Sequence, residues 1–318
     1  MWKSLTIWLG VAGISSLLPW AMLASANQAK KPQVRQRAKL PDFSSRDAEE
    51  YFFPNVFEKL NGDRPSSAES AVEGVPERSA PEEVDRGDPW SQFISATTIT
   101  DEIKARKILI DKNVTTPSDF AGRGHKPVRR DHSLLAVLFA IVEEYDGDIR
   151  FQRSAAVARA RFARAASNAK AGGSLSVYNE AKLRKQDLQD LVGGGRLSSE
   201  GRPPAMEWAK VVNRTALMQR LELASQERLT PFTRDAETRQ RHRDEITHES
   251  ELVSAIAHVL TKEGVEDGDD EDYAKLARAM QVAAQEMAAA MKRDDSSSVR
   301  AAAGQISKAC ADCHELYR

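Results

Sequence analysis

The chain has 318 residues, of which 41% are hydrophobic, 29% are charged and only 6% are aromatic, and its formal net charge is -1. A net charge so close to zero gives no general attraction to nucleic acid, so we expect no nucleic-acid partner. The low aromatic content disfavours a β-rich protein, and the abundance of Ala, Leu, Glu, Arg and Lys in the second half favours helices. Composition therefore predicts an all-α protein.

Residues 1–26 are typical of a signal peptide. Lys3 gives a short positive region, residues 5–23 are mostly apolar, and the Ala-Ser-Ala sequence at 24–26 resembles a cleavage site. We therefore expect a periplasmic or otherwise exported protein. The apolar stretch also approaches the length of about 18 residues that can cross a bilayer. The alternative is an uncleaved anchor in the inner membrane with the protein facing the periplasm, and we expect a membrane partner only in that case.

Residues 27–95 are expected to be mostly a disordered linker. Residues 61–89 are rich in Pro, Ser, Gly, Glu and Asp, which cannot bury much apolar surface. An aromatic cluster predicts a short helix near 43–60, and it either packs on its own domain or docks another protein.

Residues 96–200 predict a first helical region. Residues 134–145 are apolar almost all round and should be buried, and three glycines at 193–195 should end the last helix. The region is either a copy of the bundle that follows it or a set of helices that extends that bundle, and the sequence leaves both open. A basic loop at 123–130 either holds an acidic partner or is solvated.

Residues 201–318 predict an antiparallel four-helix bundle with short loops. The helices are expected at about 206–229, 244–263, 270–293 and 296–317, each with apolar residues at helical spacing. Asp295 or Ser296 can cap the last helix. Met280 belongs to the apolar stripe of the third helix, where we expect core packing.

The end of the last helix carries the motif Cys310-Ala-Asp-Cys313-His314, which contains both cysteines of the chain. This C-x-x-C-H pattern is the attachment signature of c-type haem. Each thiol can add to one vinyl group, and the histidine can supply the proximal iron ligand. A C-x-x-C pair can also be a disulfide or redox pair. The adjacent histidine and the exported context favour one covalently attached haem c, which makes residues 96–200 a haem-less region.

A c-type haem motif at the end of the last helix of a four-helix bundle resembles the cytochrome c prime family. The resemblance covers roughly residues 205–318 and the ending Cys-His-x-x-Tyr-Arg. It implies that the first helix covers the haem face opposite His314. In low-spin members a methionine on that helix ligates iron, so the resemblance implies Met218 as sixth ligand, with Arg214 near a propionate. Arg318 is similar to the arginine that closes the family motif and would lie near the haem edge. The alternative for Met218 is a core residue.

The leading functional hypothesis is transfer of single electrons in the periplasm between redox partner proteins. The alternative is a five-coordinate haem that binds nitric oxide or another small gas, with Leu217, Met218 and Leu221 as an apolar wall. A third interpretation makes residues 41–60 and 97–195 docking elements of an interaction protein. The sequence shows no acid–base or nucleophile constellation, so we expect no enzyme. The family resemblance implies a homodimer as one candidate assembly.

Overall fold

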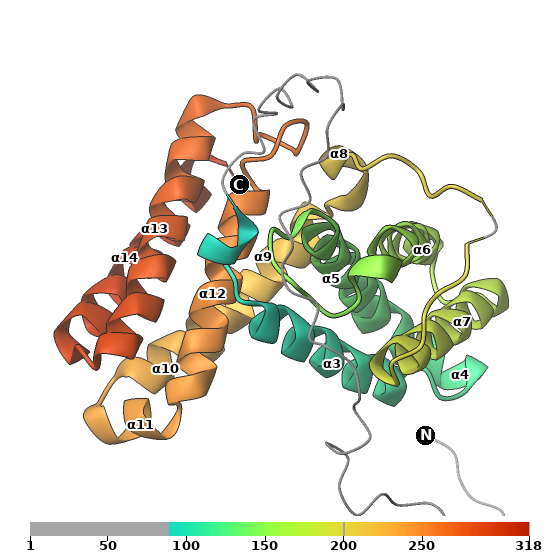
Figure 1. Cartoon of the computed structure of the whole chain (residues 1–318), viewed down its shortest axis with the longest axis horizontal. Coiled ribbons are helices and arrows are strands. Elements are labelled where there is room, and N and C mark those ends of the chain that lie inside the picture. The colour runs from blue at the N-terminus through green and yellow to red at the C-terminus, as the bar shows by residue number, and fades with distance from the viewer. Residues whose placement is uncertain (1–88, 200, 318) are drawn as a thin grey trace, which may run out of the picture. The chain divides into compact units, whose positions relative to one another are not determined.

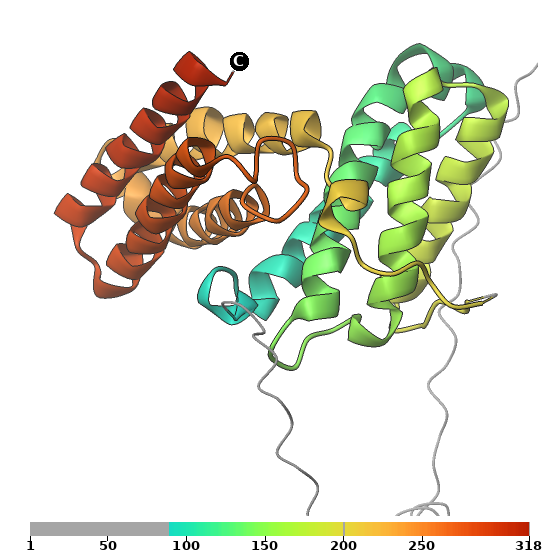
Figure 2. The same ribbon diagram turned by 90° about the horizontal axis from the view of Figure 1, so that it is seen from above.

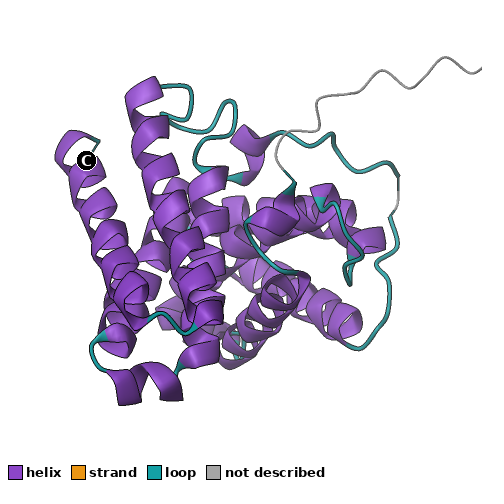
Figure 3. Cartoon of the chain, turned by 60° about the vertical axis from the view of Figure 1, so that its left-hand side comes forward, coloured by secondary structure: helices purple, strands orange, loops and turns teal. Residues whose placement is uncertain are grey.

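Every element in the described part of the chain is a helix. The computed structural model describes residues 89–199 and 201–317, and no strand occurs among them (Figure 3). The expected all-α fold class is therefore confirmed. The signal at 1–26, the aromatic helix near 43–60 and Arg318 lie outside the described residues. The longer helices are α3 (Ala96–Asn113), α5 (His125–Glu144), α6 (Ala155–Asn168), α7 (Leu175–Val192), α9 (Arg214–Glu222), α12 (Arg243–Val259), α13 (Glu271–Arg293) and α14 (Ser296–Leu316). The shorter ones are α4 (Pro117–Asp119), α8 (Trp208–Val211), α10 (Thr230–Thr233) and α11 (Ala236–Arg241).

Helices α3, α5, α6 and α7 pack on one another as a closed set. Helix α5 contacts α3 and α6, and α7 contacts both of these helices (Figure 1). Residues 134–142 of α5 are buried on all sides, as expected from their continuous apolar sequence, whereas Glu143 and Glu144 at the end of the stretch expected to be buried are not. Helix α7 ends at Val192, immediately before the three glycines. The buried apolar side chains of these four helices belong to the same hydrophobic core cluster as those of the C-terminal helices.

The folded part begins before the boundary expected at residue 96. Trp90, Phe93 and Ile94 are buried, with 3%, 4% and 1% of their surfaces exposed. Trp90 Nε1 donates a hydrogen bond to Glu144 Oε2 at the end of α5. The last residues of the segment expected to be linker therefore belong to the core, because they supply large apolar side chains.

The C-terminal helices α12, α13 and α14 lie side by side, and the segment from α9 to α10 packs across them (Figure 2). Asp270 and Asp295 cap α13 and α14 by accepting backbone N–H bonds with their carboxylates. The expected inward residues of α14, including Val299 and Ile306, are buried. No helix in the described ranges combines the length and the apolar character needed to cross a membrane.

The first helix of this bundle differs from the expected single helix at 206–229. Val212 is extended and separates α8 from α9, and the Asn213 side chain caps α9 by accepting a bond from Ala216 N. At the other end, the chain stays helical through Pro231 by way of a π-helical turn, Leu223–Leu229. A proline lacks the N–H that an α-helix needs, and the wider turn accommodates this.

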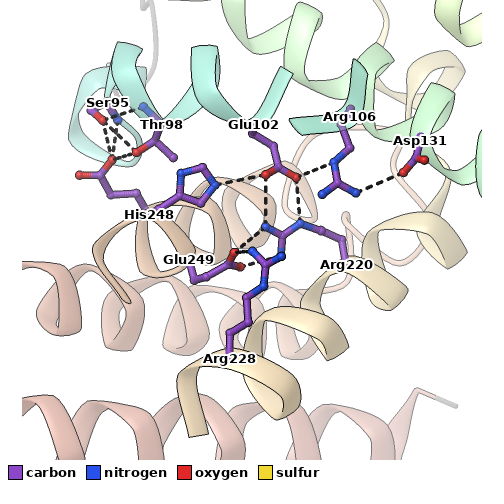
Figure 4. A network of polar contacts seen from close by, with 10 residues as sticks. Ser95, Thr98, Glu102, Arg106, Asp131, Arg220, Arg228, His248 and Glu249 are labelled. Atoms are coloured by element: carbon purple, nitrogen blue, oxygen red, sulfur yellow. Dashed lines mark hydrogen bonds and ion pairs between the residues drawn. The ribbon is translucent and has the colours of Figure 1, made fainter. Parts of the chain in front are cut away.

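A buried network of charges joins α9 to α3 and α12 (Figure 4). Arg220 on α9 donates to Glu102 on α3 at 3.0 Å and to Glu249 on α12 at 2.6 Å. Arg220, Glu102 and Glu249 are 3%, 1% and 0% exposed. Arg228 also pairs with Glu249, and Arg106 pairs with Glu102 at 3.1 Å. Both buried carboxylates therefore have cationic partners, as buried charges require.

The network keeps its members charged. Burial alone would raise the pKa of Glu102, but the hydrogen bond with His248 and the neighbouring guanidinium groups hold that pKa well below its ordinary value. Burial likewise opposes the charge of Arg220, but the two glutamates raise its pKa above the ordinary value. These contacts fix the position of α9 against the N-terminal helices.

Candidate haem-binding site

A cavity of about 570 Å³ lies between α9, α13 and α14. Its size falls within the range of about 300–1,000 Å³ that is usual for small-molecule and cofactor sites. The chain segments that line it are α9 with its π-helical turn, the first turns of α13, and the end of α14. The lining residues of α9 and the following turn are Thr215, Met218, Gln219, Leu221, Glu222, Ser225 and Gln226.

The end of α14 brings the haem-attachment motif to this cavity. Cys310, Cys313 and His314 all line it. The two cysteines are partly buried, and Cys310 Sγ lies 3.9 Å from Met280 Sδ on α13. His314 is exposed. An α-helix turns about 100° per residue, so positions 310, 313 and 314 share one face of α14, and that face borders the cavity.

The environment of the cysteines differs from that of a redox-active pair. Burial raises the pKa of both the Cys310 and the Cys313 thiol. A catalytic C-x-x-C pair depends on a lowered pKa, because the thiolate is the reactive form. The site therefore favours thiols that serve as attachment points over thiols that exchange disulfides.

On α9, Met218 borders the cavity with its half-buried side chain. Met218 lies on the second of the two helices that replace the single helix expected at 206–229, because the chain breaks at residues 212–213 between α8 and α9. Leu221 does line the cavity, whereas Leu217 is 0% exposed and packs in the core instead. The structure thus brings Met218 and His314 to one cavity from two helices, and ligation of iron by Met218 stays a prediction.

Tyr273 on α13 was not singled out by sequence reasoning, although it is the largest fully buried side chain in the described part of the chain. It lines the cavity, it is 0% exposed, and its hydroxyl has no hydrogen-bond partner within the described residues. Burial raises the pKa of Tyr273 to about 12, so the hydroxyl keeps its proton and remains a donor. Leaving such a group unpaired costs free energy, so a polar group bound in the cavity would satisfy it.

Arg214, the first residue of α9, reaches the C-terminal end of α14 with its side chain. Its guanidinium donates to the Tyr317 carbonyl at 3.1 Å and forms an ion pair with Asp267. It also lies over the Tyr273 ring at 5.1 Å. Arg214 does not line the cavity itself. The structure therefore places it beside the motif, where it ties the start of α9 to the end of α14, and its expected contact with a propionate stays a prediction.

Met287, Met291 and His258 lie away from the cavity, whereas Met280 borders it. Met287 and Met291 are buried in the core, as expected for the apolar stripe of α13. His258 stacks on Phe93, with 4.2 Å between ring centroids. Met280, expected to be core only, is buried but also borders the cavity and contacts Cys310. Only the packing of α13 against α14 distinguishes Met280 from the other methionines.

The residues around the cavity fit a haem group. Two thiols and a histidine border a cavity of suitable size, and Tyr273, whose buried hydroxyl has no partner within the described residues, also lines it. No curated protein and no solved structure matches the chain. Residues 268–318, which include α13, α14 and the attachment motif, match the family model described as Cytochrome C'. This part of the chain is therefore similar to the C-terminal region of Cytochrome C' proteins, a family that binds haem c.

Proposed function

We propose that the chain is an exported mono-haem c-type cytochrome that carries single electrons in the periplasm. One observation supports this most directly. Cys310, Cys313 and His314 border a cavity of about 570 Å³ to which α9 contributes Met218. Bound haem would supply an iron that alternates between the ferric and ferrous states.

In this proposal the chain attaches, orients and shields the haem. Cys310 and Cys313 form the two thioether links, and His314 ligates the iron. Met218 is the candidate for the sixth position, where a thioether ligand favours the ferrous state and raises the reduction potential. Tyr273, Leu276 and Ala277 of α13 line the cavity and would exclude water from one side of the group.

An absorption spectrum tests the proposal on protein produced in a host that attaches c-type haem. A covalent haem, shown by mass, and a sharp split ferrous band are expected for six-coordinate low-spin iron. The double variant Cys310→Ser/Cys313→Ser should lose the covalent haem. Wild-type protein without covalent haem would overturn the proposal.

The Met218→Ala variant then assigns the sixth ligand. We expect it to lose the low-spin spectrum. Met206→Ala is a matched control, because Met206 is also a half-buried methionine of this region and does not border the cavity. An unchanged spectrum in Met218→Ala would remove Met218 from the mechanism.

The second candidate function is the binding of nitric oxide or another small neutral gas at five-coordinate iron. Leu221 favours it, because this side chain adds apolar surface to the α9 wall beside Met218. A broad, unsplit ferrous band in the wild type, followed by a spectral change on addition of nitric oxide, would support gas binding over electron transfer.

A further inference from the structure

A second cavity, of about 400 Å³, lies where the start of α5, the turn after α6 and the start of α9 meet. Four cationic side chains line it, and none of its lining residues is acidic. This basic pocket consists of His125, Lys126, Pro127, Arg129, Arg130, Ser133, Ala169, Lys170, Gly172, Asn213, Thr215, Ala216 and Gln219. The formal net charge of the whole chain is only -1, so the pocket is a strong local concentration of positive charge.

Three of the four cations of the basic pocket form no ion pair within the described residues, and the fourth, Arg130, has only a long one. Within the described residues, Lys126, Arg129 and Lys170 form no ion pair. The carboxylate nearest to Arg130 is that of Asp131, at 4.0 Å, and it already pairs with another arginine at 3.2 Å. The arginines of the adjacent α6 behave differently, since Arg159, Arg161 and Arg164 each pair with a carboxylate at 3.0 Å or less.

The basic pocket is next to the haem cavity. Thr215 and Gln219 of α9 line both spaces, so the two cavities share part of one wall. Asn213 and Ala216 also place the N-terminus of α9 at the pocket, and the positive end of the helix dipole adds to its potential. A negatively charged group held in this pocket would therefore lie beside the haem.

We propose that the basic pocket docks a carboxylate-rich surface loop of the redox partner protein. The proposal rests on the proposed electron-transfer function. Charge complementarity selects the partner, because unpaired arginines and lysines around a concave site fit several carboxylates together. Such a field also steers an anionic partner toward the haem and raises association rates by about 10- to 1,000-fold. The sequence had left open whether residues 123–130, expected to be a loop but helical in the structure, hold an acidic partner or are solvated.

Two small redox reagents of opposite charge test the position of this field. Stopped-flow experiments measure two rates in the wild type and in Arg129→Glu/Lys170→Glu. One is the rate at which ferricyanide oxidises the ferrous protein, and the other is the rate at which hexaammineruthenium(II) reduces the ferric protein. We expect the reversal to slow the ferricyanide reaction about tenfold or more at low ionic strength and to speed the other reaction. Both differences should vanish near 1 M salt, where charges are screened within about 3 Å.

Lys182→Glu/Arg300→Glu is the matched control, because it reverses two exposed cations on α7 and α14 that do not line the pocket. If this control changes the rates as much as Arg129→Glu/Lys170→Glu does, the field is not focused at the pocket and the inference fails. If neither reagent exchanges electrons with the wild-type haem protein, the proposed electron-transfer function fails instead.

Binding of a hexaglutamate peptide tests the docking site without electron transfer. Calorimetry on the full haem-loaded chain at low salt should show binding to the wild type and to the control, and at least a tenfold loss in Arg129→Glu/Lys170→Glu. Binding that persists in this variant would overturn the inference. Inorganic phosphate that binds as tightly as the peptide would also overturn it, because the pocket would then take a small anion and not a protein loop.

Discussion

The interior of the N-terminal helices contains a histidine that should stay neutral well below pH 6. His132 on α5 is 1% exposed, and neither ring nitrogen has a hydrogen-bond partner within the described residues. Its ring packs against Phe162, with 5.5 Å between centroids. Burial, with a smaller contribution from Arg184, lowers the pKa of His132 from 6.5 to about 3.

This shift predicts a definite loss of stability in mild acid. Between pH 6.5 and 3 the unfolded chain binds a proton that folded His132 does not bind, so acid favours unfolding. The stabilising contribution is complete above pH 6.5 and decreases by about 1.4 kcal/mol for each pH unit below it. At pH 5, which is about 1.5 units lower, the free energy of unfolding should have lost about 2 kcal/mol from this residue alone.

Urea unfolding of the full chain at pH 7 and pH 5 measures this loss. We expect the wild type to lose about 2 kcal/mol more than His132→Leu over this interval, because leucine carries no proton. NMR titration of the histidine rings gives a second measurement on the wild type, in which the His132 ring should not titrate above pH 5. A His132 ring that titrates near pH 6, or equal losses in both proteins, would refute the reasoning.

Three further substitutions test the packing around the site. Arg220→Met removes the cationic partner of two buried glutamates, so it should lower the free energy of unfolding, measured in urea, by about 3–5 kcal/mol. Arg234→Met is the control, because this side chain is 72% exposed, and it should change the free energy of unfolding by less than about 0.5 kcal/mol. Tyr273→Phe removes an unpaired buried hydroxyl, so the urea midpoint should not fall, while the reduction potential of the haem protein, measured by spectroelectrochemistry, should shift. Gly124→Ala places a Cβ 2.4 Å from the Asn113 carbonyl oxygen and should lower the thermal midpoint by an amount equivalent to about 1–3 kcal/mol.

The sequence predicted most reliably what depends on local periodicity. The bounds of α13 and α14 agree with the expected 270–293 and 296–317 to within one residue, because caps and apolar stripes are encoded close together in the chain. The attachment motif is also local, since five consecutive residues carry it. The spacing of the motif residues puts them on one face of α14, and in the structure that face borders the cavity.

Features that depend on distant contacts could not be predicted. Glu102 and Arg220 are separated by 118 positions, and nothing in either neighbourhood indicates that they pair. The break before α9 is set by Asn213 and an extended Val212 inside a stretch with good helical periodicity. Tyr273 could be assigned to an apolar stripe from its spacing, but only the packed structure shows that it lines a cavity and that its hydroxyl has no partner within the described residues.

Helix α9 connects the haem cavity to the N-terminal helices. Met218 and Arg220 are two residues apart, which is about 200° around a helix, so one faces the cavity while the other faces the ion network.

A fragment of residues 201–318 would leave Arg220 without Glu102 and would also expose the surface of α9 that packs on α5. We therefore expect the fragment to be less stable than the full chain in urea, and Arg220→Met to recover part of that loss within the fragment. A fragment with full stability and an unchanged haem spectrum would contradict this. Slower electron transfer in the fragment is evidence for a docking role of residues 41–60 and 97–195 only if its haem spectrum first proves identical to that of the full chain, because loss of the α9 support alone would disturb Met218.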